Sequence, residues 1–251
     1  MNSPDQLGRL FGGIPFIDDG FRFNAIVSAV ALKRASLLAD GRSITSELLS
    51  PSVARRIYAF RSEALNLSIP LNQLPSKQAD RVSWANRTIL RAMPEWEQLF
   101  ALPIEYFALD DARVSATCSL IPQSVFLGTR AFHTEDTLLE TVLHETAHTS
   151  LNLLREISNF EVREHEEVYT LPSGAAGKSP SGVLLAAHFA LTVSKYCLKL
   201  PEKNARNRAQ YLLNYSKLCI ESLSFSSALS ELGQFVHHRL DSCLSHLEVV
   251  E

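Results

Sequence analysis

The segment VLHETAHTSL, residues 142–151, contains two histidines four positions apart with a glutamate directly after the first. Residues i and i+4 of an α-helix lie on one face, one turn apart, so His144 and His148 would project together. Two imidazoles in this arrangement can bind one divalent metal ion. Glu145 could take a proton from a metal-bound water or orient a ligand. The segment therefore predicts a metal-binding helix, although a motif with three specified positions also occurs by chance.

The motif does not contain the third protein ligand of a catalytic metal ion. The extended pattern His-Glu-x-x-His-x-x-Gly-x-x-His does not match, because Leu151 stands at the glycine position and Leu154 at the position of the third histidine. The polar segment that follows offers four carboxylates: Glu161, Glu164, Glu166 and Glu167. His188 is the better candidate, since it is the only polar side chain in the apolar run 183–191. The alternative reading of His188 is a core histidine whose ring bonds a backbone carbonyl.

The metal would decide between two reactions. Three neutral imidazoles on iron(II) leave positions for a 2-oxo acid and dioxygen, and a site without a protein carboxylate favours an anionic chelator. The second carboxylate of 2-oxoglutarate then needs an arginine or lysine. Arg155, seven residues after His148 on the same helix, is one candidate. With zinc, Glu145 would instead be the general base for a hydrolytic water. The motif leaves oxygenase and peptidase open.

Three blocks of the sequence resemble a known family. The stretch CSLIPQSVFLGTRAFHTEDTLLETVLHETAHTSLNLL (118–154) is similar to the core of the His-Glu-x-x-His peptide β-hydroxylases, which use iron and 2-oxoglutarate in peptide natural-product pathways. KSPSGVLLAAHFALTV (178–193) resembles a second block of that family, and LSELGQFVHHRL (229–240) resembles its C-terminal helix. Together the blocks span about half of the chain.

The resemblance implies a ligand set and a co-substrate contact. It implies His144, His148 and His188 as the iron ligands, and a basic residue for the distal carboxylate of 2-oxoglutarate. Lys178 stands where the family usually has an arginine, and the family's Trp-Arg stretch is absent from YTLPSGAAGKSP. Lys178 is therefore the candidate by resemblance, beside Arg155 from helix periodicity.

The elements that must position these residues are mostly helical. Helices are expected at 21–41, 50–68, 80–93, 135–157, 181–199, 203–223 and 226–247. Thr134 is expected to cap the motif helix, and two acidic residues follow it in the first turn. Short segments at 104–109 and 124–129 are rich in aromatic or β-branched residues and are expected to be strands. The connector 161–181 is expected to be a loop that closes over the site and carries Lys178.

These elements predict one mainly α domain (α+β), with a helical part at 1–100 and a metal-site core at 101–251. A zincin-like His-Glu-x-x-His helix follows a small β-sheet. The leading function is an iron(II)/2-oxoglutarate oxygenase that hydroxylates an unactivated carbon of a peptide or amino acid, free or bound to a carrier or leader. The alternatives are a zinc metallopeptidase and a non-catalytic binding protein with a vestigial site.

The net charge, the apolar stretches and the cysteines restrict the classes of binding partner and the cellular compartment that we expect. The formal charge of −3 predicts no nucleic acid or anionic membrane as a partner. The longest nearly apolar stretch, 183–193, is too short to span a bilayer, and no secretory signal is read at the N-terminus. Four widely spaced cysteines without a CxxC pair are typical of reduced thiols, so a cytoplasmic protein is expected. The sequence leaves the oligomeric state open.

Overall fold

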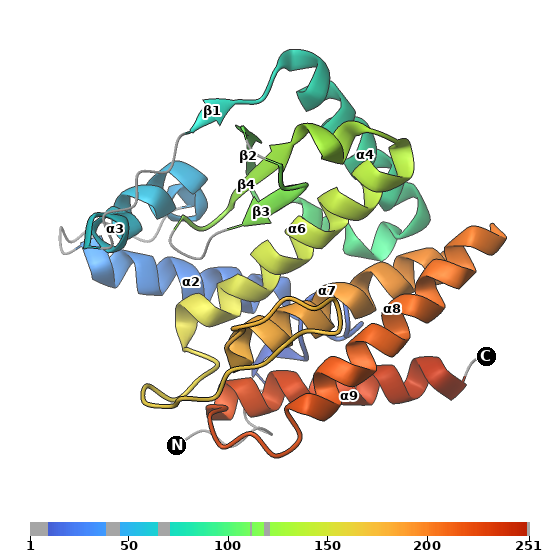
Figure 1. The fold of residues 1–251 in the computed structure, drawn as a ribbon. Coiled ribbons are helices and arrows are strands. Elements are labelled where there is room, and N and C mark those ends of the chain that lie inside the picture. Colours follow the sequence, from blue (N-terminus) through green and yellow to red (C-terminus); the bar gives the residue numbers. More distant parts are fainter. Residues whose placement is uncertain (1–9, 39–45, 65–70, 111, 118–120, 250–251) are drawn as a thin grey trace. The chain divides into compact units, whose positions relative to one another are not determined.

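The computed structural model describes residues 10–38, 46–64, 71–110, 112–117 and 121–249 (Figure 1). The protein is mainly helical with a small mixed sheet, which confirms the predicted fold class at that level. The described residues divide into two compact units. We call residues 26–157 the sheet unit, and residues 10–25 together with 158–249 the helical unit. This grouping differs from the expected parts 1–100 and 101–251, because the N-terminal segment groups with the C-terminal helices.

The sheet has four strands in the order β1-β2-β4-β3. Their bounds are Asn72–Gln73 for β1, Glu105–Leu109 for β2, Ser115–Thr117 for β3 and Ser124–Gly128 for β4. β2 pairs in parallel with β4, whereas β1 and β3 are antiparallel to their neighbours. All five residues of β4 are buried, as expected for a strand with neighbours on both sides. Phe107 of β2 and Phe126 of β4 stack at 5.5 Å between ring centroids.

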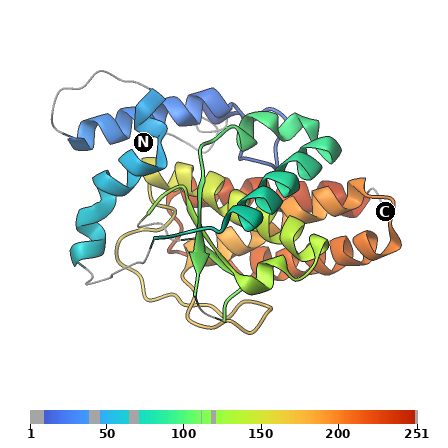
Figure 2. The same cartoon turned by 90° about the horizontal axis from the view of Figure 1, so that it is seen from above.

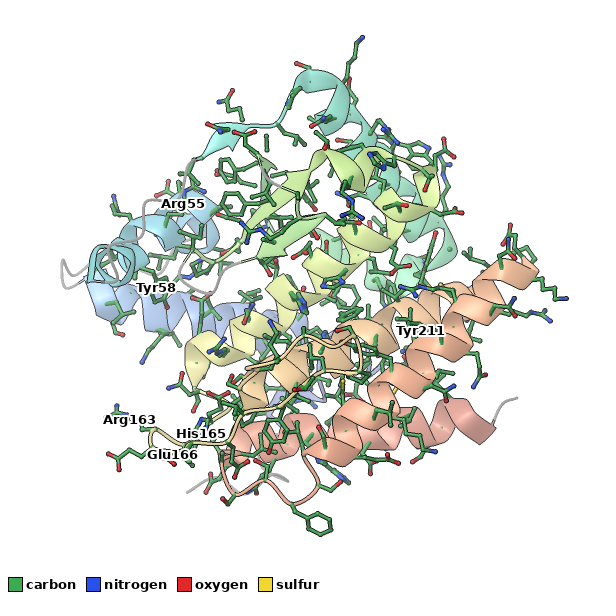
Figure 3. All side chains as sticks on the ribbon, viewed as in Figure 1. Arg55, Tyr58, Arg163, His165, Glu166 and Tyr211 are labelled. Atoms are coloured by element: carbon green, nitrogen blue, oxygen red, sulfur yellow. The ribbon has the colours of Figure 1, made fainter. Side chains whose placement is uncertain are left out.

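Helices of the sheet unit flank this sheet (Figure 1). They are α2 (Phe23–Leu38, which begins in the helical unit), α3 (Pro51–Ala64), α4 (Ser76–Ala92), α5 (Glu97–Phe100) and α6 (Glu135–Ile157), with 3-10 turns at η1 (Ser46–Leu49), η2 (Pro94–Trp96) and η3 (Thr129–Phe132). Arg55 of α3 bonds the carboxylate of Glu105 and lies over the Phe107 ring, 5.5 Å from its centroid (Figure 3). This contact attaches α3 to β2.

The motif helix α6 begins and ends where the sequence predicts. The Thr134 hydroxyl accepts a hydrogen bond from the Thr137 amide at 3.0 Å, which caps the first turn. Leu138, Leu143, Ala147 and Leu154 are fully buried and form the apolar side of the helix, whereas Leu139 is half-buried.

A buried ion pair anchors the last turn of α6. Arg34 of α2 is fully buried and donates to both carboxylate oxygens of Glu156, at 2.9 and 2.7 Å. The third donor of Arg34 reaches the carbonyl of Leu48 at 2.8 Å, and the Tyr58 hydroxyl adds a bond to Glu156 at 3.1 Å. Because a buried charge is costly unless it is paired, this network restricts where the C-terminal end of the motif helix can lie.

The helical unit contains three long helices, which lie side by side in both views (Figure 1 and Figure 2). They are α7 (Pro180–Lys199), α8 (Lys203–Ser222) and α9 (Glu231–Val249). The Ser179 side chain caps α7 by accepting from the Gly182 amide, and Pro180 occupies the first helical position. The prediction that α9 begins at 226 is wrong. Residues 226–230 are irregular and include an isolated β-bridge between Leu229 and Glu161; the Ser230 hydroxyl then accepts from the Gly233 amide at the start of the helix.

Most other expected elements are confirmed with shifted ends. The helix expected at 80–93 begins at Ser76, directly after Pro75. The ends of the helices expected at 21–41 and 50–68 lie outside the described residues, as does Cys118. None of the three described cysteines, Cys197, Cys219 and Cys243, forms a disulfide with another described residue. Within the described part of the chain, α7 alone is long and apolar enough to cross a membrane, but 72% of its apolar window is buried, as in a core helix.

Candidate metal and acid-base site

His144 and His148 lie one turn apart on α6, and their Nε2 atoms point toward each other. The two Nε2 atoms are 2.9 Å apart, with ring centroids at 4.4 Å and the ring planes edge-on at 87°. Both residues are half-buried. The expectation that the two imidazoles share one face of the helix is confirmed.

The distance between the two nitrogens suits a shared cation. At metal–nitrogen distances of about 2.0–2.1 Å, two ligands at a right angle would be about 2.9 Å apart, and at the tetrahedral angle about 3.4 Å. The observed 2.9 Å falls at the short end of this range, but it is a hydrogen bond in which one Nε2 donates to the other, and a shared ion would have to replace it. Among the described residues, no three His, Cys, Asp or Glu side chains converge closely enough to hold a metal ion. The third ligand therefore stays a prediction.

Glu145 is buried beside the sheet, 3% exposed, and its carboxylate contacts β3. The Ser115 hydroxyl donates to Oε1 at 2.6 Å, and Thr117 supplies a second hydrogen bond. Burial raises the pKa of Glu145 to about 7, against the opposing effect of these two donors. Desolvation also raises the pKa of Tyr106, and the nearby Glu145 carboxylate adds to that rise. Glu145 therefore exchanges a proton near neutral pH, where an acid-base group is most effective.

Replacing Ser115 with alanine is expected to raise the pKa of Glu145 further, because the charged carboxylate loses its 2.6 Å donor. We expect a loss of about 1–3 kcal/mol in the free energy of unfolding at pH 8, where the carboxylate is charged. Carboxyl carbon NMR titration of the metal-free protein would measure the pKa. Ser83→Ala, at an exposed serine of α4, is the control and should leave the Glu145 titration unchanged. An unchanged titration in Ser115→Ala would contradict the role of Ser115.

The two candidate contacts for the co-substrate lie in different units. Arg155 is in the last turn of α6 and is partly exposed. Lys178 is at the end of the connector in the helical unit, where its backbone pairs with Tyr169 through bonds of 2.8 and 2.9 Å. Both residues remain predicted contacts for a carboxylate.

His188 is fully buried on α7, in the helical unit. Its Nε2 lies 2.8 Å from the carbonyl oxygen of Pro15, and its ring is tilted against that of Phe16, with centroids 6.4 Å apart. Burial lowers the pKa of His188 to about 4, so the ring is neutral at physiological pH. A neutral ring bonded to a carbonyl agrees with the core-histidine alternative. It also agrees with a metal ligand, since ligating histidines commonly donate their other N–H to a carbonyl.

The connector glutamates have partners within the helical unit. Glu161 accepts from the Ser181 amide at the start of α7. Glu167 accepts from the hydroxyl groups of Ser226, Tyr169 and Ser227, and these bonds lower the pKa of Glu167 to about 2. The connector is thus attached to the turn between α8 and α9, where the Val162 amide also donates to the Ala228 carbonyl at 2.8 Å.

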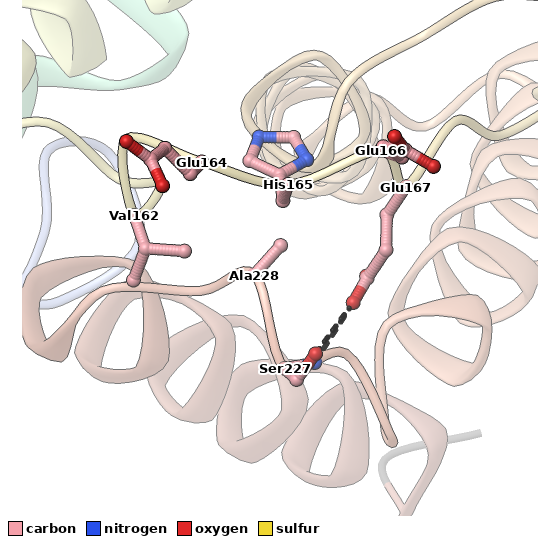
Figure 4. A pocket seen from close by; sticks show the side chains of 7 residues that line it. All are labelled: Val162, Glu164, His165, Glu166, Glu167, Ser227 and Ala228. Carbon is pink, nitrogen blue, oxygen red and sulfur yellow. Dashed lines mark hydrogen bonds between the residues drawn. The ribbon is translucent and has the colours of Figure 1, made fainter.

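A pocket of about 410 Å³ lies between the connector and this turn (Figure 4). It is lined by Val162, Glu164, His165, Glu166, Glu167, Ser227 and Ala228. Three of the four connector glutamates that were candidates for the third metal ligand line this pocket. The fourth, Glu161, lies outside the lining, and its carboxylate is 3.5 Å from Nε2 of His165. Arg163, on the same connector, is exposed and is not among the residues that line the pocket (Figure 3).

No protein-family model matches the chain, and no curated protein matches it in sequence. The resemblance to the peptide β-hydroxylases therefore rests on the three blocks quoted above.

Sequence reasoning missed the partners of Glu145. β3 is only three residues long, and its SAT sequence has too few positions for a periodic signal. The one available signal was the alternation of Ser115, Ala116 and Thr117, which directs the two hydroxyl side chains to the same face.

Proposed function

We propose that this protein is an iron(II)- and 2-oxoglutarate-dependent hydroxylase that acts on an unactivated carbon of a peptide or amino acid. The observation that carries the proposal is the pair of adjacent imidazoles on α6, with Nε2 atoms 2.9 Å apart. The ordered resemblance of three blocks to the peptide β-hydroxylases supports iron and 2-oxoglutarate over other metal chemistry. The substrate would be free or attached to a carrier or leader, in the cytoplasm.

Each residue has a role in this proposal. His144 and His148 hold the ion, and His188 is the proposed third ligand. When bound, iron(II) would let dioxygen oxidise both 2-oxoglutarate, which leaves as succinate and carbon dioxide, and the C–H bond, which becomes C–OH. Glu145, restrained by the Ser115 hydroxyl, orients a ligand or a water and exchanges its proton near neutral pH. Arg155 or Lys178 binds the distal carboxylate of the co-substrate.

One observation favours the zinc peptidase as a second candidate. The pKa of Glu145, raised by burial to about 7, suits a general base that takes a proton from a metal-bound water. In the hydroxylase, Glu145 would only orient a ligand or a water and would not need a pKa near 7. The peptidase therefore requires proton transfer by Glu145, whereas the hydroxylase does not.

The test uses protein stripped of metal and reloaded without oxygen, either with iron(II) or with zinc(II). With iron(II), addition of 2-oxoglutarate is expected to produce a visible charge-transfer band, because the co-substrate chelates the ion. Admission of oxygen should then yield succinate. Metal-free protein and the His144→Ala variant are the controls, and both should give neither signal.

Two outcomes would overturn the hydroxylase. One is cleavage of peptides by the zinc-loaded protein without oxygen, which would establish the peptidase. The other is stoichiometric iron without the charge-transfer band, which would show that 2-oxoglutarate is not the co-substrate. The band needs no primary substrate, so its absence could not be attributed to a missing peptide.

A further inference from the structure

Helix α8 of the helical unit has an exposed side with the spacing of a coiled-coil seam. Alternate steps of three and four residues along this side reach six side chains, all of them exposed: Asn204, Asn207, Tyr211, Asn214, Leu218 and Glu221. Such steps keep side chains on one stripe of a helix, which a second helix can cover. We call these six residues the outer seam.

The other side of α8 holds the helix in its unit. Its buried residues are Ala209, Leu212, Leu213, Tyr215, Ser216, Cys219 and Ile220. Both α7 and α9 contact α8. Because the outer seam is exposed, its side chains are not part of this core.

The centre of the outer seam exposes large apolar side chains. Tyr211 and Leu218 are each 54% exposed, and they lie seven residues apart, which is about 10.5 Å along the helix axis. The Arg208 guanidinium lies over the ring of Tyr211, which is labelled in Figure 3, at 5.0 Å from its centroid. Phe225 is fully exposed in the turn after the helix. A partner that covers these side chains would remove their apolar surface from water, which is favourable.

α8 is basic within an acidic chain. It contains four basic residues and one acidic residue, so its formal charge is +3, whereas the whole chain carries −3. Lys203 and Lys217 each come directly before a seam residue and border one flank of the seam. Arg208 comes directly after Asn207 and borders the other flank. In helix pairs, charges at these flanking positions select the partner.

The basic residues do not stabilise α8 itself. Lys203 and Arg206 lie in its first turn, which contains no acidic residue. The N-terminal end of a helix is the positive end of its dipole, so cations there are unfavourable. A negatively charged partner along this end of α8 would offset that repulsion.

Charge and composition select one kind of partner for the outer seam. A second copy of α8 would bring two helices of charge +3 together, which is repulsive. A lipid surface would take Asn207, Asn214 and Glu221 out of water beside apolar chains without giving them donors. An acidic helix instead offers carboxylates to the basic flanks, and its polar groups can bond the asparagines, as seam asparagines do in coiled coils.

We propose that the outer seam of α8 docks an acidic amphipathic helix of a partner protein. Tyr211 and Leu218 pack against the apolar stripe of that helix, and the basic flanks face its carboxylates. The docking surface lies within the helical unit, and none of its residues belongs to the candidate metal and acid-base site.

Two synthetic helical peptides test this surface on the full-length protein. Each has about four heptads, with leucine and alanine alternating at the seam positions and either glutamate or lysine at the flanking positions. Fluorescence anisotropy should show a dissociation constant on the order of 10 μM for the glutamate peptide and a value roughly tenfold higher or more for the lysine peptide. Equal affinities, or no binding of the glutamate peptide, would overturn the proposal.

Variants of exposed residues locate the binding. Leu218→Ala should weaken binding of the glutamate peptide by about tenfold or more, the usual effect of truncating an anchor side chain. Leu32→Ala is the matched control, because Leu32 of α2 is also 54% exposed. Lys203→Glu should reduce the preference for the glutamate peptide by about tenfold, and Lys33→Glu, at an exposed lysine of α2, makes the same charge change elsewhere. Equal effects of a seam variant and its control would refute the assignment to α8.

Sedimentation velocity of the protein alone, and flotation with phosphatidylserine vesicles, test the two other occupants. Both measurements should give the same result for the wild type and Leu218→Ala. Self-association that Leu218→Ala abolishes would assign the outer seam to a second copy of the chain. Vesicle binding that the same variant abolishes would assign it to a lipid surface. Either outcome would overturn the proposal.

Discussion

Replacing His148 with alanine is expected to reduce the affinity for zinc(II) or iron(II) by at least 100-fold. The variant keeps His144 but loses the nitrogen that faces it at 2.9 Å. Loss of an outer partner of a ligand costs about 10- to 100-fold, so loss of a ligand itself should exceed that range. At 25 °C a 100-fold change is about 2.8 kcal/mol. Titration calorimetry with zinc, and metal analysis after anaerobic dialysis against iron, would measure the change.

The control for this variant is His133→Ala. His133 is an exposed histidine just before α6, outside the motif, so its loss tests whether any nearby imidazole contributes. It should retain wild-type affinity, and both variants should keep the helical circular dichroism. Full metal occupancy in His148→Ala would show that the two imidazoles of α6 do not share an ion.

Replacing Glu145 with glutamine is expected to remove a large pH dependence from the stability of the metal-free protein. Burial raises the pKa of Glu145 from 4.5 to about 7, so the folded protein binds this proton more tightly than the unfolded chain does. The stabilising contribution is complete below pH 4.5 and is lost as the pH rises through 7. The total is about 3 kcal/mol. Glutamine is neutral throughout and retains an oxygen that can accept from Ser115.

Urea unfolding between pH 4.5 and 8, with a chelator present, would measure this difference. Relative to Glu145→Gln, the wild type should lose about 3 kcal/mol across the range. Glu95→Gln, at an exposed carboxylate in the same unit, should follow the wild-type profile. Parallel profiles for the wild type and Glu145→Gln would show that Glu145 does not hold its proton to neutral pH.

The motif helix could be predicted to the residue because its signals are local. Thr134, two acidic residues and a regular apolar spacing all lie within 135–157, and hydrogen bonds four residues apart propagate the helix from them. Strands β2 and β4 were also predicted, because their apolar residues are bounded by prolines and a glycine. β3 was not, since three residues contain too little pattern.

The late start of α9 shows a non-local cause. Residues 226–230 continue into a helical apolar pattern, so the sequence predicted a helix from 226. In the structure, the Ser226 and Ser227 hydroxyl groups bond Glu167, which is about 60 positions earlier, and the Ser230 hydroxyl bonds the Asn159 carbonyl. These contacts hold the segment in an irregular conformation and delay the helix to Glu231.

The spacing of His144 and His148 by itself determined that their imidazoles share one face, since four residues make about one helical turn whatever surrounds the helix. The environment of Glu145 required the tertiary structure, because β3 places Ser115 against it from 30 positions away. The hydrogen bond at His188 likewise depends on Pro15, which is 173 positions earlier. Both depend on which segments pack together, and packing follows from the burial of apolar surface across the whole unit, which no short window of sequence contains.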